Sequence, residues 1–277
     1  MKAKALVLDI DGTILNSKGE MTRVTYDALL ECQRKGIIIC IATSRSGRLV
    51  FRSTDIHWKH NFLLERGVYY MGGTVFDHPH HFYQHTAIPG LLVERVIQKI
   101  VEFDPTLQIA LQHDNEYHSF RIQMPDEHLK SWGFNRDELL DFEMAKAKPT
   151  TKIMAFSGTN FHGILNDLSG LFDVLKAEFF DSLNIILADS RKAIYIVSEY
   201  ASKGNAVKTL ISFYDIKPEE VAVLGDDTPD IGMFGMFGYS IAMGNAHESL
   251  KSSATFVTKN NDEEGVVFAL THYLKLI

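Results

Sequence analysis

The chain has 277 residues, of which 45% are hydrophobic and 23% charged, a composition typical of a globular protein with one large domain or two modest ones. The formal net charge of -7 argues against nucleic acid as a partner, because binding to a phosphate backbone needs a basic face. No run approaches the roughly 18 apolar residues of a membrane span, and Asp9 interrupts the first apolar stretch too early for a signal peptide. Two cysteines make no disulfide framework. We therefore expect a cytoplasmic protein without a membrane partner, whose oligomeric state the sequence leaves open.

The first third of the chain alternates strand and helix patterns. Aliphatic runs predict strands at 4–9 and 37–42, and the apolar periodicity between them predicts a helix at 22–35, with Thr22 as N-cap and Gly36 at its end. A helix near 46–54 and strand-like segments around 62–70 and 74–77 follow, with a tight turn at Gly72-Gly73. The alternation resumes after Ser202. We expect a helix at 203–213, a strand at 221–224, helices near 229–236, 246–251 and 263–274, and short strands at 239–242 and 255–257.

The middle of the chain has a different order of predicted helices and strands. Pro89 suits the first turn of a helix that runs to about Glu102. After it we expect strands at 107–112 and 118–123, a short helix near 126–132, a strand at 151–157, a helix at 161–178, and strands at 184–188 and 193–198. This order favours a separate α+β layer. The predicted fold is therefore α/β, with a Rossmann-like parallel-sheet core formed by 1–82 and 193–277 and an α+β domain inserted at 83–192.

Three polar patches directly follow buried-strand patterns. They are Asp9-Ile10-Asp11-Gly12-Thr13, Thr43-Ser44-Arg45 and Gly225-Asp226-Asp227-Thr228-Pro229-Asp230. In an open α/β sheet the ligand site lies outside the carboxyl ends of the strands. Parallel strands would bring all three patches to that edge, where the crowded carboxylates need a cation.

The residue types in these patches suit phosphate chemistry. One carboxylate of the pair Asp9 and Asp11 can attack as a nucleophile while the other moves a proton, although a lone pair of this kind is also a common acidic turn. Asp226 and Asp230 are oxygen ligands of the kind that Mg²⁺ prefers, or alternatively an acidic turn that caps a helix.

Two further side chains could hold a phosphoryl group. The Thr43 hydroxyl can donate to a phosphate oxygen, or it can cap a helix that begins near Arg45. Lys203 opens a predicted helix and can neutralise phosphoryl charge, whereas most lysines are simply exposed. We interpret a histidine cluster in a predicted hairpin as a solvated loop, because its spacing fits no zinc pattern: His78, His80, His81 and His85.

Taken together, these motifs resemble those of the haloacid dehalogenase superfamily, in particular its Cof-type hydrolases of subclass IIB, which carry a large α/β cap between the second and third motifs. The first, second and fourth motifs are the three patches above, and the third is Lys203. The stretches Met243-Gly244-Asn245-Ala246 and Asn261-Asp262-Glu263-Glu264-Gly265-Val266 also look like that family. The resemblance covers nearly the whole chain.

The resemblance implies a role for each motif residue. Asp9 would be the nucleophile that forms an aspartyl-phosphate, and Asp11 the general acid and base. Mg²⁺ would be held by Asp9, the backbone carbonyl of Asp11 and Asp226. Asp230 would support the site, either as a further ligand of the metal or by holding its ligands in place. Phosphoryl oxygens would be bound by Thr43, Ser44 and Lys203. The implied activity is Mg²⁺-dependent hydrolysis of a small phosphorylated metabolite, such as a sugar phosphate or a phosphorylated cofactor.

Three residues depart from the pattern of that family. Pro229 replaces an asparagine of the fourth motif, Ser44 replaces a glycine, and Gly72 stands where an asparagine is frequent. A proline offers neither a side-chain amide nor a backbone N–H. Pro229 therefore supports one alternative function on the same fold, a non-catalytic sensor of a phosphorylated ligand. A phosphomutase, which would retain the phosphoryl group, is a further alternative.

Overall fold

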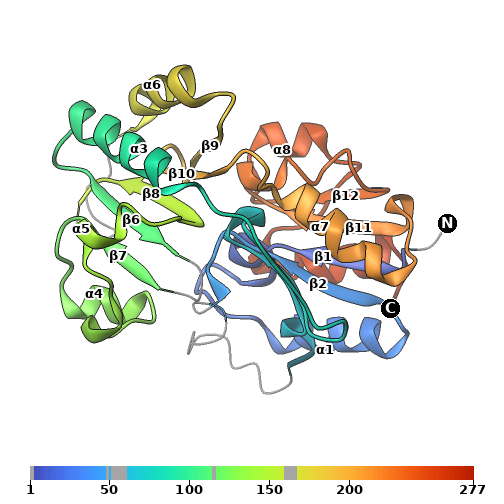
Figure 1. The fold of residues 1–277 in the computed structure, drawn as a ribbon. Helices are drawn as coiled ribbons and strands as arrows, with labels where there is room; N and C mark the ends of the chain where they lie inside the picture. The colour runs from blue at the N-terminus through green and yellow to red at the C-terminus, as the bar shows by residue number, and fades with distance from the viewer. Residues whose placement is uncertain (1–2, 48–49, 51–60, 114–116, 159–166) are drawn as a thin grey trace. The chain divides into compact units, whose positions relative to one another are not determined.

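An eight-stranded sheet forms the centre of the first of two units in this computed structural model, which describes residues 3–47, 50, 61–113, 117–158 and 167–277. The unit comprises the described residues of Met1–Arg45, Ser53–Gln84 and Ser202–Ile277. Its strand order is β13-β12-β11-β1-β2-β3-β4-β5, and the pairings from β13 to β3 are all parallel. Figure 1 shows β1, β2, β11 and β12 side by side. The strand bounds are β1 (Ala5–Leu8), β2 (Ile38–Ala42), β3 (Arg66–Tyr69), β4 (Thr74–Asp77), β5 (Phe82–His85), β11 (Val221–Gly225), β12 (Tyr239–Ala242) and β13 (Phe256–Val257).

The central strands are buried on both faces. Every residue of β1 and β11 is buried, as expected for parallel strands covered by helices on both sides. The helices of this unit are α1 (Arg23–Arg34), α7 (Lys203–Ile211), α8 (Glu248–Ser253) and α9 (Gly265–Phe268). Thr22 caps α1 as predicted, because its Oγ1 accepts from the N–H of Thr25 at 3.1 Å. On one face, Val7 and Val223 pack in a single apolar cluster with Val207 and Leu210 of α7.

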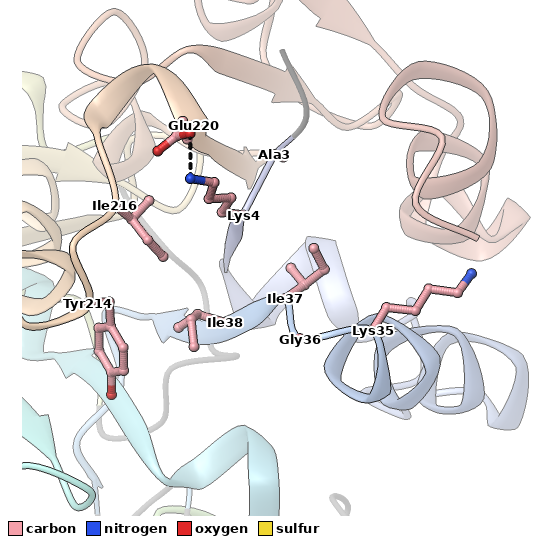
Figure 2. Close-up of a pocket in the computed structure, with 9 residues that line it drawn as sticks. All are labelled: Ala3, Lys4, Lys35, Gly36, Ile37, Ile38, Tyr214, Ile216 and Glu220. Atoms are coloured by element: carbon pink, nitrogen blue, oxygen red, sulfur yellow. Dashed lines mark ion pairs between the residues drawn. The ribbon is translucent and has the colours of Figure 1, made fainter.

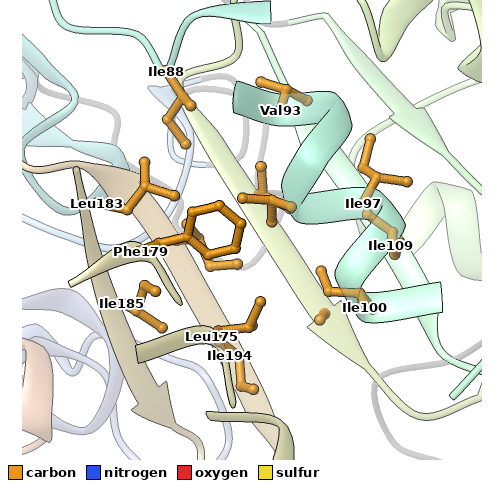
Figure 3. Close-up of a cluster of buried hydrophobic side chains, with 14 of the residues drawn as sticks. Ile88, Val93, Ile97, Ile100, Ile109, Leu175, Phe179, Leu183, Ile185 and Ile194 are labelled. Carbon is orange, nitrogen blue, oxygen red and sulfur yellow. The ribbon is translucent and has the colours of Figure 1, made fainter. Parts of the chain in front are cut away.

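The second unit comprises the described residues of Ser46–Arg52 and His85–Ala201. Its five-stranded sheet has the order β7-β6-β8-β10-β9, and all four pairings are antiparallel. Figure 3 shows α3 lying across this sheet, with Val93, Ile97 and Ile100 facing the apolar core. The bounds are α3 (Gly90–Phe103), β6 (Gln108–Gln112), β7 (His118–Phe120), α4 (Asp126–Ser131), α5 (Phe142–Ala145), β8 (Lys152–Phe156), α6 (Ser169–Phe179), β9 (Leu183–Ala188) and β10 (Ala193–Ser198). The predicted fold class, a parallel α/β core with a separate α+β layer, is confirmed.

Several local predictions were wrong or incomplete. The helix expected at 229–236 is only a 3₁₀ turn, Thr228–Asp230, followed by turns. The helix expected at 263–274 begins at Gly265 and continues as a π-helix over Ala269–Tyr273. The short helix α5 was not predicted. Most of the helix expected near 46–54, and the segment 161–166 of the helix expected at 161–178, lie outside the described residues.

In the part of the chain that the structure describes, we find no helix with both the length and the apolar character of a membrane span.

Candidate active site

Three loops meet at one edge of the core sheet. Asp9 follows β1, Thr43 follows β2 and Asp226 follows β11, and β1 lies between the other two strands. Leu8 is level with Ile41 on one side and with Leu224 on the other. The three polar patches therefore leave the sheet side by side, at the carboxyl ends of the parallel strands.

A buried lysine connects two of these patches. Lys203 is the first residue of α7, whose N-cap Ser202 accepts from the N–H of Asn205 at 3.1 Å. The Lys203 Nζ donates to Asp9 Oδ1 at 2.6 Å and to Asp230 Oδ1 at 2.7 Å, and the lysine side chain is 2% exposed. Burial alone would lower the pKa of Lys203, but the carboxylates of Asp230 and Asp9 outweigh it and raise that pKa. The lysine therefore stays charged and acts as an internal counter-ion.

When ionised, the surrounding carboxylates carry more negative charge than one lysine balances. Asp9, Asp226 and Asp230 each offer a carboxylate oxygen, and these oxygens lie within 4.8 Å of one another. Burial, together with the charges of Asp230 and Asp11, raises the pKa of Asp9 to about 8 although Lys203 opposes this shift. Burial and the charges of Asp9 and Asp230 likewise raise the pKa of Asp226 to about 9. An all-oxygen donor set with excess negative charge fits a hard divalent cation.

Asp230 is held on both oxygens by the protein itself. Its Oδ1 accepts from Lys203, and its Oδ2 accepts from the N–H groups of Asp226 and Asp227 at 3.0 and 3.2 Å. This closes the turn after β11 and fixes the direction in which Asp226 leaves the strand. Asp230 was expected either to bind the metal directly or to support the residues that do. Because both of its oxygens already accept hydrogen bonds from the protein, these contacts favour the supporting role.

Gly12 allows the first loop to approach Asp226 closely. Its φ is +72°, and a Cβ built on it would lie 2.1 Å from Asp226 Oδ2. Thr13 Oγ1 donates to Asp226 Oδ1 at 3.1 Å. The Asn245 amide donates to the Gly12 carbonyl at 2.9 Å, and it also reaches Asp226 Oδ2 at 3.4 Å. Asn261 in turn orients Asn245, because its N–H donates to Asn245 Oδ1 at 3.0 Å.

Thr13 and Asn245, which both contact Asp226, had no predicted role. Thr13 stands in the first motif, and Asn245 in the Met243–Ala246 stretch that resembles the family, so both were visible as part of a pattern. Nothing local to either residue showed that it would reach Asp226.

The loop after β2 is tightly held. The Thr43 side chain is fully buried, and its Oγ1 accepts from the N–H of Arg45 at 3.1 Å, so the hydroxyl supports its own loop. This bond leaves the hydroxyl proton available for an acceptor. Ser44, half-buried, lies between them. A phosphate-binding role for Thr43 and Ser44 stays a prediction.

Asp11 does not join the acidic cluster. Its side chain is 58% exposed, and both of its oxygens accept from the Arg45 guanidinium, Oδ2 from Nε at 2.8 Å and Oδ1 from Nη2 at 2.6 Å. Arg45 was noted in the second motif but received no role.

Two of the three residues that depart from the family pattern, Pro229 and Gly72, have local explanations. Pro229 is buried inside the 3₁₀ turn Thr228–Asp230, where its fixed φ suits the backbone. Gly72 has a φ of +103°, and a Cβ there would lie 2.4 Å from backbone atoms of Ser202. An asparagine at this position would collide with the start of α7.

The histidine cluster forms no metal site among the described residues, where Asp9, Asp226 and Asp230 are the only group that could hold an ion. His80 instead approaches the buried Asp77, with 3.1 Å between Nδ1 and Oδ1. His78, His80 and His81 are exposed and His85 is half-buried, as expected for a solvated loop.

A pocket of about 490 Å³ lies at the amino ends of β1 and β2, away from the acidic cluster (Figure 2). Its lysines already have partners: Lys4 pairs with Glu220 at 2.8 Å, and Lys35 donates to the carbonyl of Leu276 at 2.9 Å. We therefore assign the chemistry to the opposite, carboxyl edge of the sheet.

Comparison with known proteins identifies the chain. The model of the haloacid dehalogenase-like hydrolase family matches residues 6–270. The 5-amino-6-(5-phospho-D-ribitylamino)uracil phosphatase YwtE of Bacillus subtilis (strain 168) is 27% identical over 290 residues, covering 98% of this chain and 98% of that protein. The phosphatase YwpJ of the same organism is 26% identical over 309 residues, covering 98% and 100%. The structure of the subclass IIB sugar phosphatase BT4131 superposes with a TM-score of 0.80 at 23% identity, covering 99% and 100%. The chain therefore belongs to the haloacid dehalogenase-like hydrolases, as a phosphatase of phosphoric monoesters of the Cof type.

Proposed function

We propose that this protein is a Mg²⁺-dependent phosphatase that hydrolyses a sugar phosphate or a phosphorylated cofactor through an aspartyl-phosphate on Asp9. The observation that carries the proposal is the group of three carboxylates at the carboxyl edge of the sheet, of which Asp9 and Asp230 are buried and bridged by Lys203. Two Bacillus subtilis relatives whose names specify a phosphorylated ribitylaminouracil substrate support the substrate class.

The set of carboxylate oxygens supports one place for the metal. Asp9, Asp226 and the backbone carbonyl of Asp11 would hold Mg²⁺, and Asp230 would support them through its bonds to Lys203 and to the turn after β11. The bound cation supplies the positive charge that lets a carboxylate approach a phosphate dianion.

The side chains divide the reaction into two steps. In the first, an oxygen of Asp9 attacks phosphorus, the bond from phosphorus to the ester oxygen breaks, and Asp11 gives its proton to that oxygen. In the second, water attacks phosphorus, Asp11 takes a proton from the water, and the bond to Asp9 breaks to release phosphate. Lys203 neutralises charge on the phosphoryl oxygens, and Thr43 and Ser44 donate to them.

The test is phosphate release from a panel of several dozen phosphorylated metabolites, with Mg²⁺ and with a chelator. We expect release only with Mg²⁺ and none from Asp9→Asn. The control is Asp27→Asn, which changes an aspartate that pairs with Arg23 on the surface of α1.

Two other outcomes would reject the proposal. Ligand-induced stabilisation without phosphate release in the presence of Mg²⁺ would favour a sensor. An isomerised product that retains the phosphoryl group would favour a mutase.

A further inference from the structure

We propose that Arg45 positions the general acid Asp11, so that the carboxyl group points at the ester oxygen of the substrate. This inference rests on the proposed function and adds a residue to it. The Arg45 guanidinium donates to both Asp11 oxygens, from Nε to Oδ2 at 2.8 Å and from Nη2 to Oδ1 at 2.6 Å. A paired contact of this kind fixes the plane of a carboxylate as well as its position.

Asp11 depends on this contact for its orientation. It is the more exposed member of the pair, at 58% against 26% for Arg45, and within the described part of the chain its oxygens accept hydrogen bonds from Arg45 alone. An exposed carboxylate without such a contact samples several rotamers. A general acid must lie within hydrogen-bond reach of the oxygen that it protonates, so lost orientation costs rate.

The backbone of Arg45 is itself fixed on both sides. Its N–H donates to Thr43 Oγ1 at 3.1 Å, and its carbonyl accepts from the N–H of Tyr70 at 3.0 Å. The N–H of Met71 donates to the Thr43 carbonyl at 3.1 Å, which ties the same loop to the turn after β3. Arg45 can therefore transmit a defined orientation to Asp11.

The arrangement is compatible with both protonation states of Asp11. A carboxylate can accept both N–H groups, whereas a neutral carboxyl group keeps one oxygen as an acceptor and carries the proton on the other. Arg45 can thus hold the acceptor oxygen while the second oxygen faces the ester.

Leaving-group dependence provides the test. Nitrophenolate leaves without a proton, whereas an alkoxide needs one, so loss of the general acid slows alkyl esters more than aryl esters. We compare kcat/KM for p-nitrophenyl phosphate with kcat/KM for the alkyl phosphate that the panel ranks first. Because kcat/KM includes no step after the leaving group departs, slow hydrolysis of the aspartyl-phosphate does not affect either value.

Arg45→Ala should lose at least tenfold more kcat/KM on the alkyl ester than on p-nitrophenyl phosphate, and Arg45→Lys should restore only part of this loss. In the Asp11→Asn background, Arg45→Ala should cause little further loss, because the arginine acts through Asp11. The matched control is Arg136→Ala, which removes a similar exposed pair with Asp126 and should leave the preference between the esters unchanged.

Equal losses of Arg45→Ala on both esters would overturn the inference and make Arg45 a binding residue for the phosphoryl group. Unchanged kinetics in a variant with wild-type Tm would also overturn it. Failure of the wild type to release phosphate from any ester would reject the proposed function, and this inference with it.

Discussion

Replacing Asp9 by asparagine should abolish turnover and still stabilise the metal-free protein. In the unfolded chain this carboxyl has its ordinary pKa of 3.8, whereas burial raises it to about 8 in the folded protein. At pH 7 the unfolded chain releases this proton, whereas the folded protein keeps it on Asp9. This difference lowers the free energy of unfolding by about 1.4 kcal/mol for each pH unit above 3.8, or roughly 4 kcal/mol. Asparagine removes this cost and keeps an oxygen for Lys203, but it buries amide N–H groups at a cost of about 1–3 kcal/mol. The net gain in free energy of unfolding is then roughly 1–3 kcal/mol, which is several degrees in Tm.

The assay is thermal unfolding in the presence of a chelator across a pH series. A carboxyl whose pKa is raised on folding contributes stability below its unfolded pKa and loses that contribution as the pH rises through its folded pKa. The advantage of Asp9→Asn should therefore be small near pH 4 and grow up to pH 8. Lys203→Met should have the opposite sign, about 3–5 kcal/mol less stable, because it leaves buried carboxylates without their counter-ion.

The surface variant Asp27→Asn should show no such dependence on pH. An advantage of Asp9→Asn that does not change between pH 5 and pH 8 would refute the electrostatic reasoning. Phosphatase activity in pure Asp9→Asn would refute the assignment of the nucleophile.

Mg²⁺ should raise the Tm more at pH 8 than at pH 5, because the metal competes with protons for carboxyl groups whose pKa values are about 8 and 9; an equal rise in differential scanning fluorimetry would contradict this. Pro229→Asn should raise kcat/KM by up to roughly tenfold if an amide there binds phosphate, whereas unchanged kinetics with a lower Tm would assign Pro229 to the turn alone. Gly72→Ala should lower both Tm and kcat, because the new Cβ meets the backbone of Ser202. The control is Gly36→Ala, since Gly36 also has a positive φ, +81°, but no heavy atom lies within 4 Å of a Cβ built there. An equal loss in the two variants would exclude the close contact as the cause.

The sequence was most informative where a short pattern carries its own physical reason. Four aliphatic residues before Asp9, and similar runs before Thr43 and Asp226, predicted strands buried on both faces, and parallel pairing then places the three polar patches at one edge. The Lys203 position followed only from the family motif, because an isolated lysine at a helix start is usually exposed.

Contacts between distant side chains were beyond local patterns. Asn245 reaches Gly12 across 233 positions, and Arg45 reaches Asp11 across 34. The helix expected at 229–236 failed for a related reason. The chain bends there at Gly235, with a φ of +74°, and then approaches Glu219 so closely at Gly238 that a Cβ would lie 2.2 Å from its carbonyl oxygen. Tertiary packing therefore overrides the helical periodicity.

The way in which Asn245 and Asn261 support Gly12 has a consequence for how the protein is made. On the ribosome, β1 and the Asp9 loop emerge long before two of their partners, because Ala5 of β1 pairs with Val221 of β11 and the Gly12 carbonyl accepts a hydrogen bond from Asn245. All residues between β1 and β11 must be synthesised before β1 gains its second neighbouring strand. The antiparallel sheet of β6 to β10, by contrast, is encoded without interruption between these two strands. We therefore expect this sheet to fold during translation, while the edge of β1 that pairs with β11 stays exposed until β11 has been synthesised.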